Sequence, residues 1–258
     1  MPSEPVLLIE RPRPGLAVVT LNRPKVMNAL SRGLRDQIAE AFIGFEAEKL
    51  SVAILTGAGR AFTAGLDLRE VSADTNLLGS PKDRDPIAAM HAFGGVIIGA
   101  INGVAVTGGF ELALACDVLV AGSEARFADT HTRIGVLPGW QLSQRLSRTI
   151  GNMRAKQMSL TGEYLDAEKA ERWGLVSEVV PTDRLMPRAL AIAEEMLKSS
   201  PAMLRAHKAL IDDGYALSLK DGLDLEAQRA RAHNSAVGAE AFTAGSEAVL
   251  AHGRANKG

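Results

Sequence analysis

Short β-rich segments and helices follow one another in a fixed order along this chain, and the order strand, strand, helix occurs more than once. β-rich residues at positions 6–9 and 16–21 predict a hairpin, and apolar side chains then recur at helical spacing after Ser31, a candidate N-cap. Asp166 is a second N-cap candidate further along the chain. The same order returns with apolar runs within 96–106 and an apolar helix at 110–116. Such repetition is typical of an α/β fold.

The balance of charges excludes several classes of partner. The 258 residues include 29 Lys plus Arg against 30 Asp plus Glu, so nothing attracts nucleic acid or an anionic membrane surface globally. Apolar stretches are interrupted well before the roughly 20 residues that a membrane span needs. Cys116 is the single cysteine, which excludes an intrachain disulfide and favours a reducing compartment. Because no secretory leader is recognisable, we expect a cytoplasmic enzyme.

The first segment that could carry chemistry is 61–67, which joins a buried strand predicted at 52–55 to a predicted helix. Backbone N–H groups near Ala64 have no strand or helix partner there, so they can point at a ligand. An ordinary strand-to-helix turn capped by Asp67 explains the same residues. On this segment alone the ordinary turn is the preferred interpretation.

The second segment is 102–113. Gly108 and Gly109 occupy the predicted start of a helix, where exposed N–H groups carry the positive end of the helix dipole. Glu111 lies in the first turn of this otherwise apolar helix. It is either a favourable dipole contact or an acid–base group whose pKa is raised by an apolar site.

The third segment is a loop predicted over 127–140, which offers Asp129 and His131 between core elements. Loops on a rigid scaffold often hold catalytic groups, although a single loop histidine is more often an ordinary polar residue. Other motifs are missing: the sequence has no Walker loop, no Rossmann fingerprint, no Gly-x-Ser-x-Gly elbow and no histidine spacing typical of zinc ligands. No metal site is therefore predicted.

Taken together, the three segments resemble the enoyl-CoA hydratase/isomerase (crotonase) superfamily. Residues 22–24 and 28–30 ahead of them, and 160–180 after them, extend the resemblance over nearly the whole chain. The resemblance implies a crotonase-like spiral of repeated ββα units at 1–198. A C-terminal helical region at 199–258 would then assemble homotrimers, often paired into hexamers.

The resemblance also implies an acyl-CoA thioester as substrate, with no cofactor beyond that coenzyme A. Two backbone N–H groups form an oxyanion hole for the thioester carbonyl in this family, and by motif position these belong to Ala64 and Gly108. Such a hole stabilises the negative charge on an enolate oxygen. The implied activity is that of a lyase, an enoyl-CoA hydratase of fatty acid and lipid metabolism, with Glu111 holding and deprotonating the water.

The same resemblance suggests how the substrate is held. Residues 23–28 would border the adenine and phosphates of CoA, residues 64–67 would line the pantetheine and thioester path, and Trp140 would reshape the acyl pocket. The residues implied in substrate binding are Arg23, Lys25, Val26, Ala64, Gly65, Leu66, Asp67, Gly108 and Trp140.

One position departs from the family pattern. Hydratases of this family typically have a second glutamate four residues after the position of Phe127, and this sequence has His131 there. Either His131 is the second acid–base group, or Glu111 acts alone, or the chemistry differs. The leading hypothesis is hydration of a 2-enoyl-CoA. The alternatives are an enoyl-CoA isomerase that uses one carboxylate, and a catalytically silent protein that binds acyl-CoA.

Overall fold

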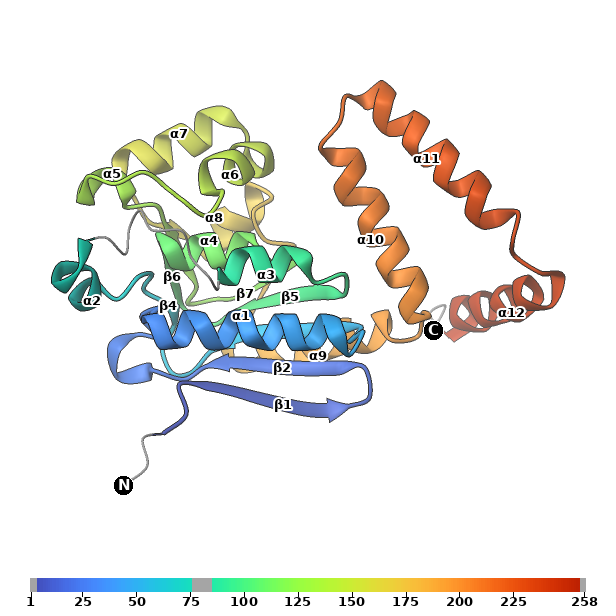
Figure 1. Cartoon of the computed structure of the whole chain (residues 1–258), viewed down its shortest axis with the longest axis horizontal. Coiled ribbons are helices and arrows are strands. Elements are labelled where there is room, and N and C mark those ends of the chain that lie inside the picture. The colour runs from blue at the N-terminus through green and yellow to red at the C-terminus, as the bar shows by residue number, and fades with distance from the viewer. Residues whose placement is uncertain (1–3, 76–84, 256–258) are drawn as a thin grey trace. The chain divides into compact units, whose positions relative to one another are not determined.

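The computed structural model describes residues 4–75 and 85–255. The chain divides into two compact units, Met1–Arg205 and Ala206–Gly258 (Figure 1). The first unit contains all the strands. The boundary between the units lies inside the helical region predicted at 199–258, within helix α10 (Pro201–Tyr215).

The larger sheet of the first unit has six strands in the order β1-β2-β3-β5-β7-β10. Their bounds are β1 Leu7–Arg13, β2 Leu16–Leu21, β3 Val52–Gly57, β5 Val96–Ile101, β7 Val118–Gly122 and β10 Glu178–Val180. The first two strands form the predicted antiparallel hairpin, and all the other pairs are parallel. Every residue of β3 and β5 is buried, which explains why these strands read as continuous apolar runs.

A second sheet has four short strands in the order β4-β6-β8-β9. Their bounds are β4 Ala61–Thr63, β6 Val104–Val106, β8 Arg126–Ala128 and β9 Leu165–Asp166. The first three are parallel, and β9 pairs with β8 in the antiparallel sense. Parallel pairing aligns the carboxyl ends of β4, β6 and β8 on one edge of this sheet.

The two sheets are connected by three ββα units, which confirms the predicted repetition. Each unit contributes one strand to the large sheet and one to the small sheet, and then enters a helix. The units are β3-β4-α2, β5-β6-α4 and β7-β8-α5, with α2 at Leu68–Ala73, α4 at Gly108–Leu114 and α5 at His131–Ile134. The loops before the three helices therefore leave the same edge of the small sheet.

Alternation along the strands divides the apolar core into two clusters. Val18 and Ile54 belong to the cluster that packs against α9 (Leu185–Met196), which lies against β3, β5 and β7. Val19 and Leu55 point to the opposite face, where the larger cluster includes Phe42 of α1 (Arg32–Ala47). The period of two residues in a strand accounts for this division.

The other helices complete the first unit, as Figure 1 shows. They are η1 (Pro24–Val26), α3 (Pro86–Ala92), α6 (Leu142–Ile150), α7 (Asn152–Thr161), α8 (Ala167–Arg172) and η3 (Thr182–Arg184). Two predicted caps are confirmed, since Ser31 caps α1 and Asp166 caps α8 through side-chain hydrogen bonds. The loop predicted over 127–140 is wrong in part, because pairing with β6 and β9 makes 126–128 a strand and α5 follows it.

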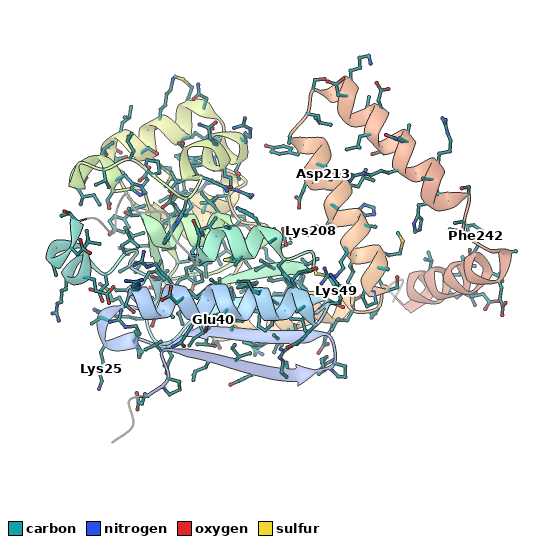
Figure 2. The ribbon with its side chains drawn as sticks, viewed as in Figure 1. Lys25, Glu40, Lys49, Lys208, Asp213 and Phe242 are labelled. Carbon is teal, nitrogen blue, oxygen red and sulfur yellow. The ribbon has the colours of Figure 1, made fainter. Side chains whose placement is uncertain are left out.

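The second unit consists of the remainder of α10 together with α11 (Leu219–Asn234) and α12 (Ala239–Ala255). Large apolar side chains on these helices face solvent, among them Ile211, Leu223 and Phe242, the last of which is labelled in Figure 2. Within residues 4–75 and 85–255, no helix combines the length and the apolar character that crossing a membrane requires.

Candidate active site

Three loops meet at the carboxyl ends of β4, β6 and β8 and surround a cavity of about 270 Å³. The three loops come from three different ββα units, so the cavity exists only because parallel strands align their ends. Its lining residues are Ala64, Leu66, Leu68, Val71, Thr107, Gly108, Glu111, Thr130, His131, Ile134, Val136, Leu137, Gly139 and Trp140. Two of these side chains are ionisable, Glu111 and His131.

The structure corrects one predicted oxyanion donor. The N–H of Ala64 donates to the carbonyl oxygen of Met27 at 3.0 Å, so it is not available to a ligand. Two residues further on, the N–H of Leu66 has no acceptor in the described part of the chain. It lies close to Gly108, because a Cβ added to Gly108 would stand 3.5 Å from the Leu66 nitrogen.

Gly108 is the first residue of α4, and its N–H likewise has no acceptor among the described residues. Gly65 allows this N–H and that of Leu66 to approach each other. Its φ of +87° is unfavourable for other residues, and a Cβ there would stand 2.6 Å from the oxygen of Val106 and 3.2 Å from the nitrogen of Gly108. Leu66 and Gly108 are therefore two free donors that lie close together at the cavity.

Glu111 lies one turn into α4 and is 3% exposed. Its Oε1 accepts the backbone N–H of Trp140 at 2.7 Å, and the carboxyl group also interacts with the backbone N–H of Leu142. Burial raises the pKa of Glu111 above its ordinary value of 4.5, although the Trp140 hydrogen bond and the nearby His131 oppose the rise. A buried carboxyl group with a raised pKa in a cavity is suited to acid–base chemistry.

His131 reaches the same cavity from the first residue of α5. Its Nε2 lies 3.6 Å from Oε2 of Glu111, and its Nδ1 lies 2.6 Å from Oδ1 of Asp129. All three side chains are buried. The tertiary structure thus brings together two residues predicted as catalytic, and adds a second carboxylate behind the histidine.

Thr107 occupies the position before Gly108 in a backbone conformation that favours glycine, with φ of +54° and ψ of −112°. Its hydroxyl is hydrogen bonded to the hydroxyl of Thr130 and accepts the N–H of Thr130 at 3.2 Å. These bonds connect the loop before α4 to the loop before α5. They hold the segment with Gly108 against the segment with His131.

Trp140 contributes both its backbone and its ring to the cavity. Besides donating to Glu111, it places its indole over Gly108, where an added Cβ would meet Cζ3 at 3.4 Å. The predicted contribution of Trp140 to the pocket agrees with this position among the lining residues.

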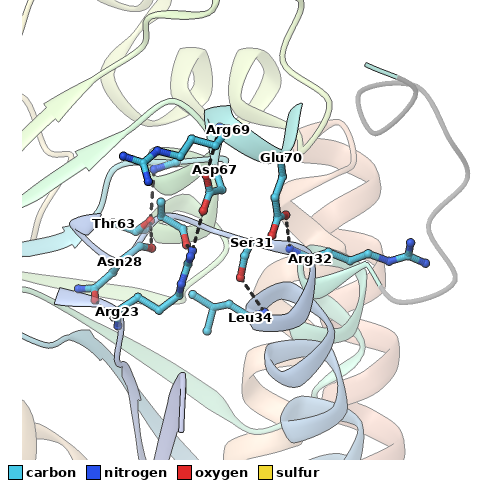
Figure 3. A network of polar contacts seen from close by, with 11 residues as sticks. Arg23, Asn28, Ser31, Arg32, Leu34, Thr63, Asp67, Arg69 and Glu70 are labelled. Atoms are coloured by element: carbon cyan, nitrogen blue, oxygen red, sulfur yellow. Dashed lines mark hydrogen bonds and ion pairs between the residues drawn. The ribbon is translucent and has the colours of Figure 1, made fainter. Parts of the chain in front are cut away.

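Arg23, one of the predicted CoA-binding residues at the start of the chain, belongs to a separate polar network, which Figure 3 shows. The guanidinium of Arg23 pairs with Asp67 at 2.9 Å and also donates to the carbonyl of Ala29. Buried Asn28 accepts the N–H of Arg23 and donates to the carbonyl oxygen of Ala61. This network fixes the loop that precedes α2.

Five predicted binding residues are not part of the cavity lining, namely Arg23, Lys25, Val26, Gly65 and Asp67. Lys25 is exposed and projects from the surface in Figure 2. The pairing with Asp67 lowers the pKa of that carboxyl group even though burial opposes it, so Arg23 and Asp67 neutralise each other.

Two features of the site could not be predicted from the sequence. Asp129 was a candidate beside His131, but its contact with Nδ1 of that residue depends on the direction of both side chains. The free N–H of Leu66 gave no signal, since any backbone N–H can be free or bonded. Among the described residues, no group of three or more His, Cys, Asp or Glu side chains is arranged to hold a metal ion.

Comparison with known proteins identifies the family of this chain. The model of the enoyl-CoA hydratase/isomerase family matches residues 11–247. A probable peroxisomal enoyl-CoA hydratase 1 of Arabidopsis thaliana is 42% identical over 254 residues, which cover 97% of this chain and 95% of the relative. This chain belongs to the enoyl-CoA hydratase/isomerase family.

Solved structures show the same fold. An enoyl-CoA hydratase from Mycobacterium tuberculosis H37Rv superposes with a TM-score of 0.75 at 44% identity, covering 90% of this chain and all of the other. A monofunctional enoyl-CoA isomerase from M. smegmatis superposes with a TM-score of 0.73 at 34% identity, covering 84% of this chain and 98% of the other. The spiral of ββα units is therefore the crotonase fold that the sequence predicts.

Proposed function

We propose that this protein is an enoyl-CoA hydratase that adds water across the double bond of a 2-enoyl-CoA. The observation that carries the proposal is the distance of 3.6 Å between Glu111 Oε2 and His131 Nε2 in one buried cavity. Hydration needs a base for the water and an acid for the α carbon. An isomerase needs only one group that moves a proton between carbons, so two adjacent ionisable groups favour hydration.

The free N–H groups of Leu66 and Gly108 form the oxyanion hole in this proposal. They donate to the thioester oxygen. Leu66 takes the role that the sequence predicted for Ala64, whose N–H is bonded to the carbonyl oxygen of Met27. As charge develops on that oxygen, each preorganised donor contributes roughly 3 kcal/mol to the barrier reduction. The first turn of α4 adds the positive end of its dipole.

The chemical step conserves every atom of water. Glu111 accepts a proton from the water as its oxygen bonds to the β carbon, and the electrons of the double bond move to the thioester as an enolate. His131 gives the proton on Nε2 to the α carbon, and the enolate collapses to the thioester. The proton on Glu111 then passes to His131, which restores the site.

Outside the cavity, we propose that the adenine and phosphate end of CoA lies along residues 23–28. Lys25 is the better candidate for a phosphate contact, because it is exposed whereas Arg23 is paired with Asp67. Val26, Gly65, Leu66 and Asp67 would border the path of the pantetheine chain. The reaction needs no metal and no cofactor beyond the CoA of its substrate.

Two further proposals concern the assembly and the compartment. The exposed apolar side chains of α10 and α11, including Ile211 and Leu223, support self-association as a trimer or a hexamer, which light scattering would measure. A cytoplasmic location is compatible with the single buried Cys116. Because the similar plant protein is described as peroxisomal, cell fractionation is the relevant test.

The function is tested with crotonyl-CoA and a matched 3-enoyl-CoA. We expect loss of the ultraviolet absorbance of the conjugated thioester and a product that has gained one water. Conversion of the 3-enoyl-CoA without uptake of water would replace the hydratase by the isomerase. Tight binding of both compounds with no conversion would indicate the silent acyl-CoA-binding protein instead. Glu111→Gln serves as the inactive variant and exposed Glu124→Gln as the control.

A further inference from the structure

Asp129 lies behind His131 and does not line the cavity. It follows β8 directly, is 2% exposed, and has its Oδ1 within 2.6 Å of His131 Nδ1. The same oxygen accepts the backbone N–H of His131 at 3.1 Å. Asp129 therefore holds both the ring and the backbone of His131, while His131 alone reaches the cavity.

This contact determines which ring nitrogen faces the substrate. A carboxylate oxygen beside Nδ1 requires a proton on that nitrogen, because two acceptors cannot form a hydrogen bond. Nε2 is thus left without a proton in the neutral ring and with one in the imidazolium. It is Nε2 that faces Glu111 across 3.6 Å.

Three elements contribute polar groups on and around His131. Glu111 approaches from α4, Asp129 from the end of β8, and Ser159 of α7 adds a hydrogen bond to Asp129. Burial opposes ionisation of Asp129, but the hydrogen bonds from His131 and Ser159 prevail and lower its pKa. No lysine or arginine is among the described residues that line the cavity. The ring of His131 thus lies between two carboxyl groups, with Glu111 on the side of Nε2 and Asp129 on the side of Nδ1.

We infer that Asp129 is a positioning residue, which fixes the tautomer and the orientation of His131, so that Nε2 faces the substrate and delivers the proton to the α carbon. This inference rests on the proposed hydration. It explains how a histidine can stand where hydratases of the family typically have a second glutamate. The buried carboxylate of Asp129 orients the imidazole for this role.

The first experiment needs no substrate. Nitrogen-15 NMR of histidine-labelled wild-type protein reports which ring nitrogen carries the proton, and His131→Gln identifies the signal. We expect the proton of the neutral ring to be on Nδ1, beside Asp129. A neutral ring with its proton on Nε2 would overturn the inference, whatever reaction the enzyme performs.

The second experiment measures the consequence for catalysis. In Asp129→Asn the amide oxygen can still accept both N–H groups, but the negative charge is lost. We expect kcat with crotonyl-CoA to fall on the order of 10²-fold with little change in KM. Asp166→Asn makes the same substitution at the cap of α8, where asparagine caps equally well, and leaves kcat unchanged.

A double variant separates positioning from general structural support. If Asp129 acts only through His131, the pair Asp129→Asn with His131→Ala is no slower than His131→Ala alone. Additive losses would instead assign Asp129 to the structure of the loop and refute the inference. Absence of hydration by the wild type would remove the proposed function but would leave the NMR result standing.

Discussion

His131 Nε2 stands 3.6 Å from Glu111 Oε2, and this pair joins two different ββα units at one cavity. Glu111 lies in the first turn of the helix of one unit, and His131 is the first residue of the helix of the next. The parallel pairing of β6 with β8 brings the two helix starts together. Acid–base catalysis at this site consequently depends on the alignment of two strands rather than on one motif.

Replacement of Glu111 by glutamine removes the base while keeping the hydrogen bond from Trp140. We expect kcat for crotonyl-CoA to fall about 10²- to 10⁴-fold, the range for loss of general acid–base catalysis. Binding of a non-reactive acyl-CoA, measured by calorimetry, should change little. Retained turnover in this variant would show that another group activates the water.

The pH dependence of the wild-type enzyme follows from the burial of Glu111. Because its pKa is raised above 4.5 and its ionised form is the base, kcat/KM should decline as the pH falls through that raised value. We expect the acidic limb of the profile above pH 4.5. Stopped-flow measurement over a pH series locates it, and a limb at or below 4.5 would contradict the role of Glu111.

Substitution of Gly65 by alanine should disturb the oxyanion hole directly. The new Cβ would press on the oxygen of Val106 and the nitrogen of Gly108, at a φ that alanine avoids. We expect kcat to fall about 10²-fold or more and the free energy of unfolding to fall by roughly 1–3 kcal/mol. Gly44→Ala in α1 is the control, since its Cβ meets nothing within 4 Å and should stabilise the helix by about 0.5–1 kcal/mol.

Stability at low pH should depend on Glu46. Hydrogen bonds from Lys49, Arg205 and the N–H of Gly94 lower the pKa of Glu46 from 4.5 to about 2. Glu46→Gln should therefore reduce the free energy of unfolding at pH 7 by about 1–2 kcal/mol. That difference is fully present above pH 4.5 and disappears as the pH falls towards 2.

Denaturant titrations at several pH values test this expectation. Glu48→Gln breaks the exposed ion pair with Arg11 and should change the stability by less than about 0.5 kcal/mol. An equal effect of the two substitutions would mean that the Glu46 network contributes no more than a surface pair.

Acyl-chain preference should follow from the apolar lining of the cavity, which includes Leu66, Val71 and Ile134. A carboxylate at the end of the acyl chain of the substrate would lose its hydration in this cavity, and no lysine or arginine among the lining residues would compensate its charge. We expect kcat/KM for 2-hexenoyl-CoA to exceed that for 2,3-dehydroadipyl-CoA, its dicarboxylic counterpart, by at least about tenfold. Leu137→Arg places a cation at an exposed position of the lining, so it should reduce the ratio of kcat/KM for 2-hexenoyl-CoA to kcat/KM for 2,3-dehydroadipyl-CoA. Equal rates for the two substrates in the wild type would refute the expectation.

Much of the fold could be predicted because its signals are local. Alternating and continuous apolar runs indicated the strands, Ser31 and Asp166 identified helix starts, and the repeated order indicated ββα units. The short elements at 126–134 could not be predicted. Their strand exists through pairing with β6 and β9, which no local pattern records.

The candidate site shows the same division. Glu111 and Gly108 could be named as candidates from the sequence, because a carboxyl group and a glycine at the start of an apolar helix are visible in the residues themselves, and the family resemblance supplied their roles. Ala64 was the wrong donor, since the carbonyl of Met27, far away in the chain, occupies its N–H. Arg23 was predicted as a cation for phosphates, and its pairing with Asp67 became visible only in three dimensions.

The sequence by itself determined the order of the ββα units, the glycines that permit close backbone approach, and the acidic residue at the start of an apolar helix. Only the tertiary structure decided which N–H groups remain free, which nitrogen of His131 faces Glu111, and that Asp129 stands behind it. The physical reason is that hydrogen-bond partners and burial arise where distant segments meet. The residue types determine which chemistry each group is capable of, whereas the packed fold determines which donors and acceptors are already occupied and which remain free for a ligand.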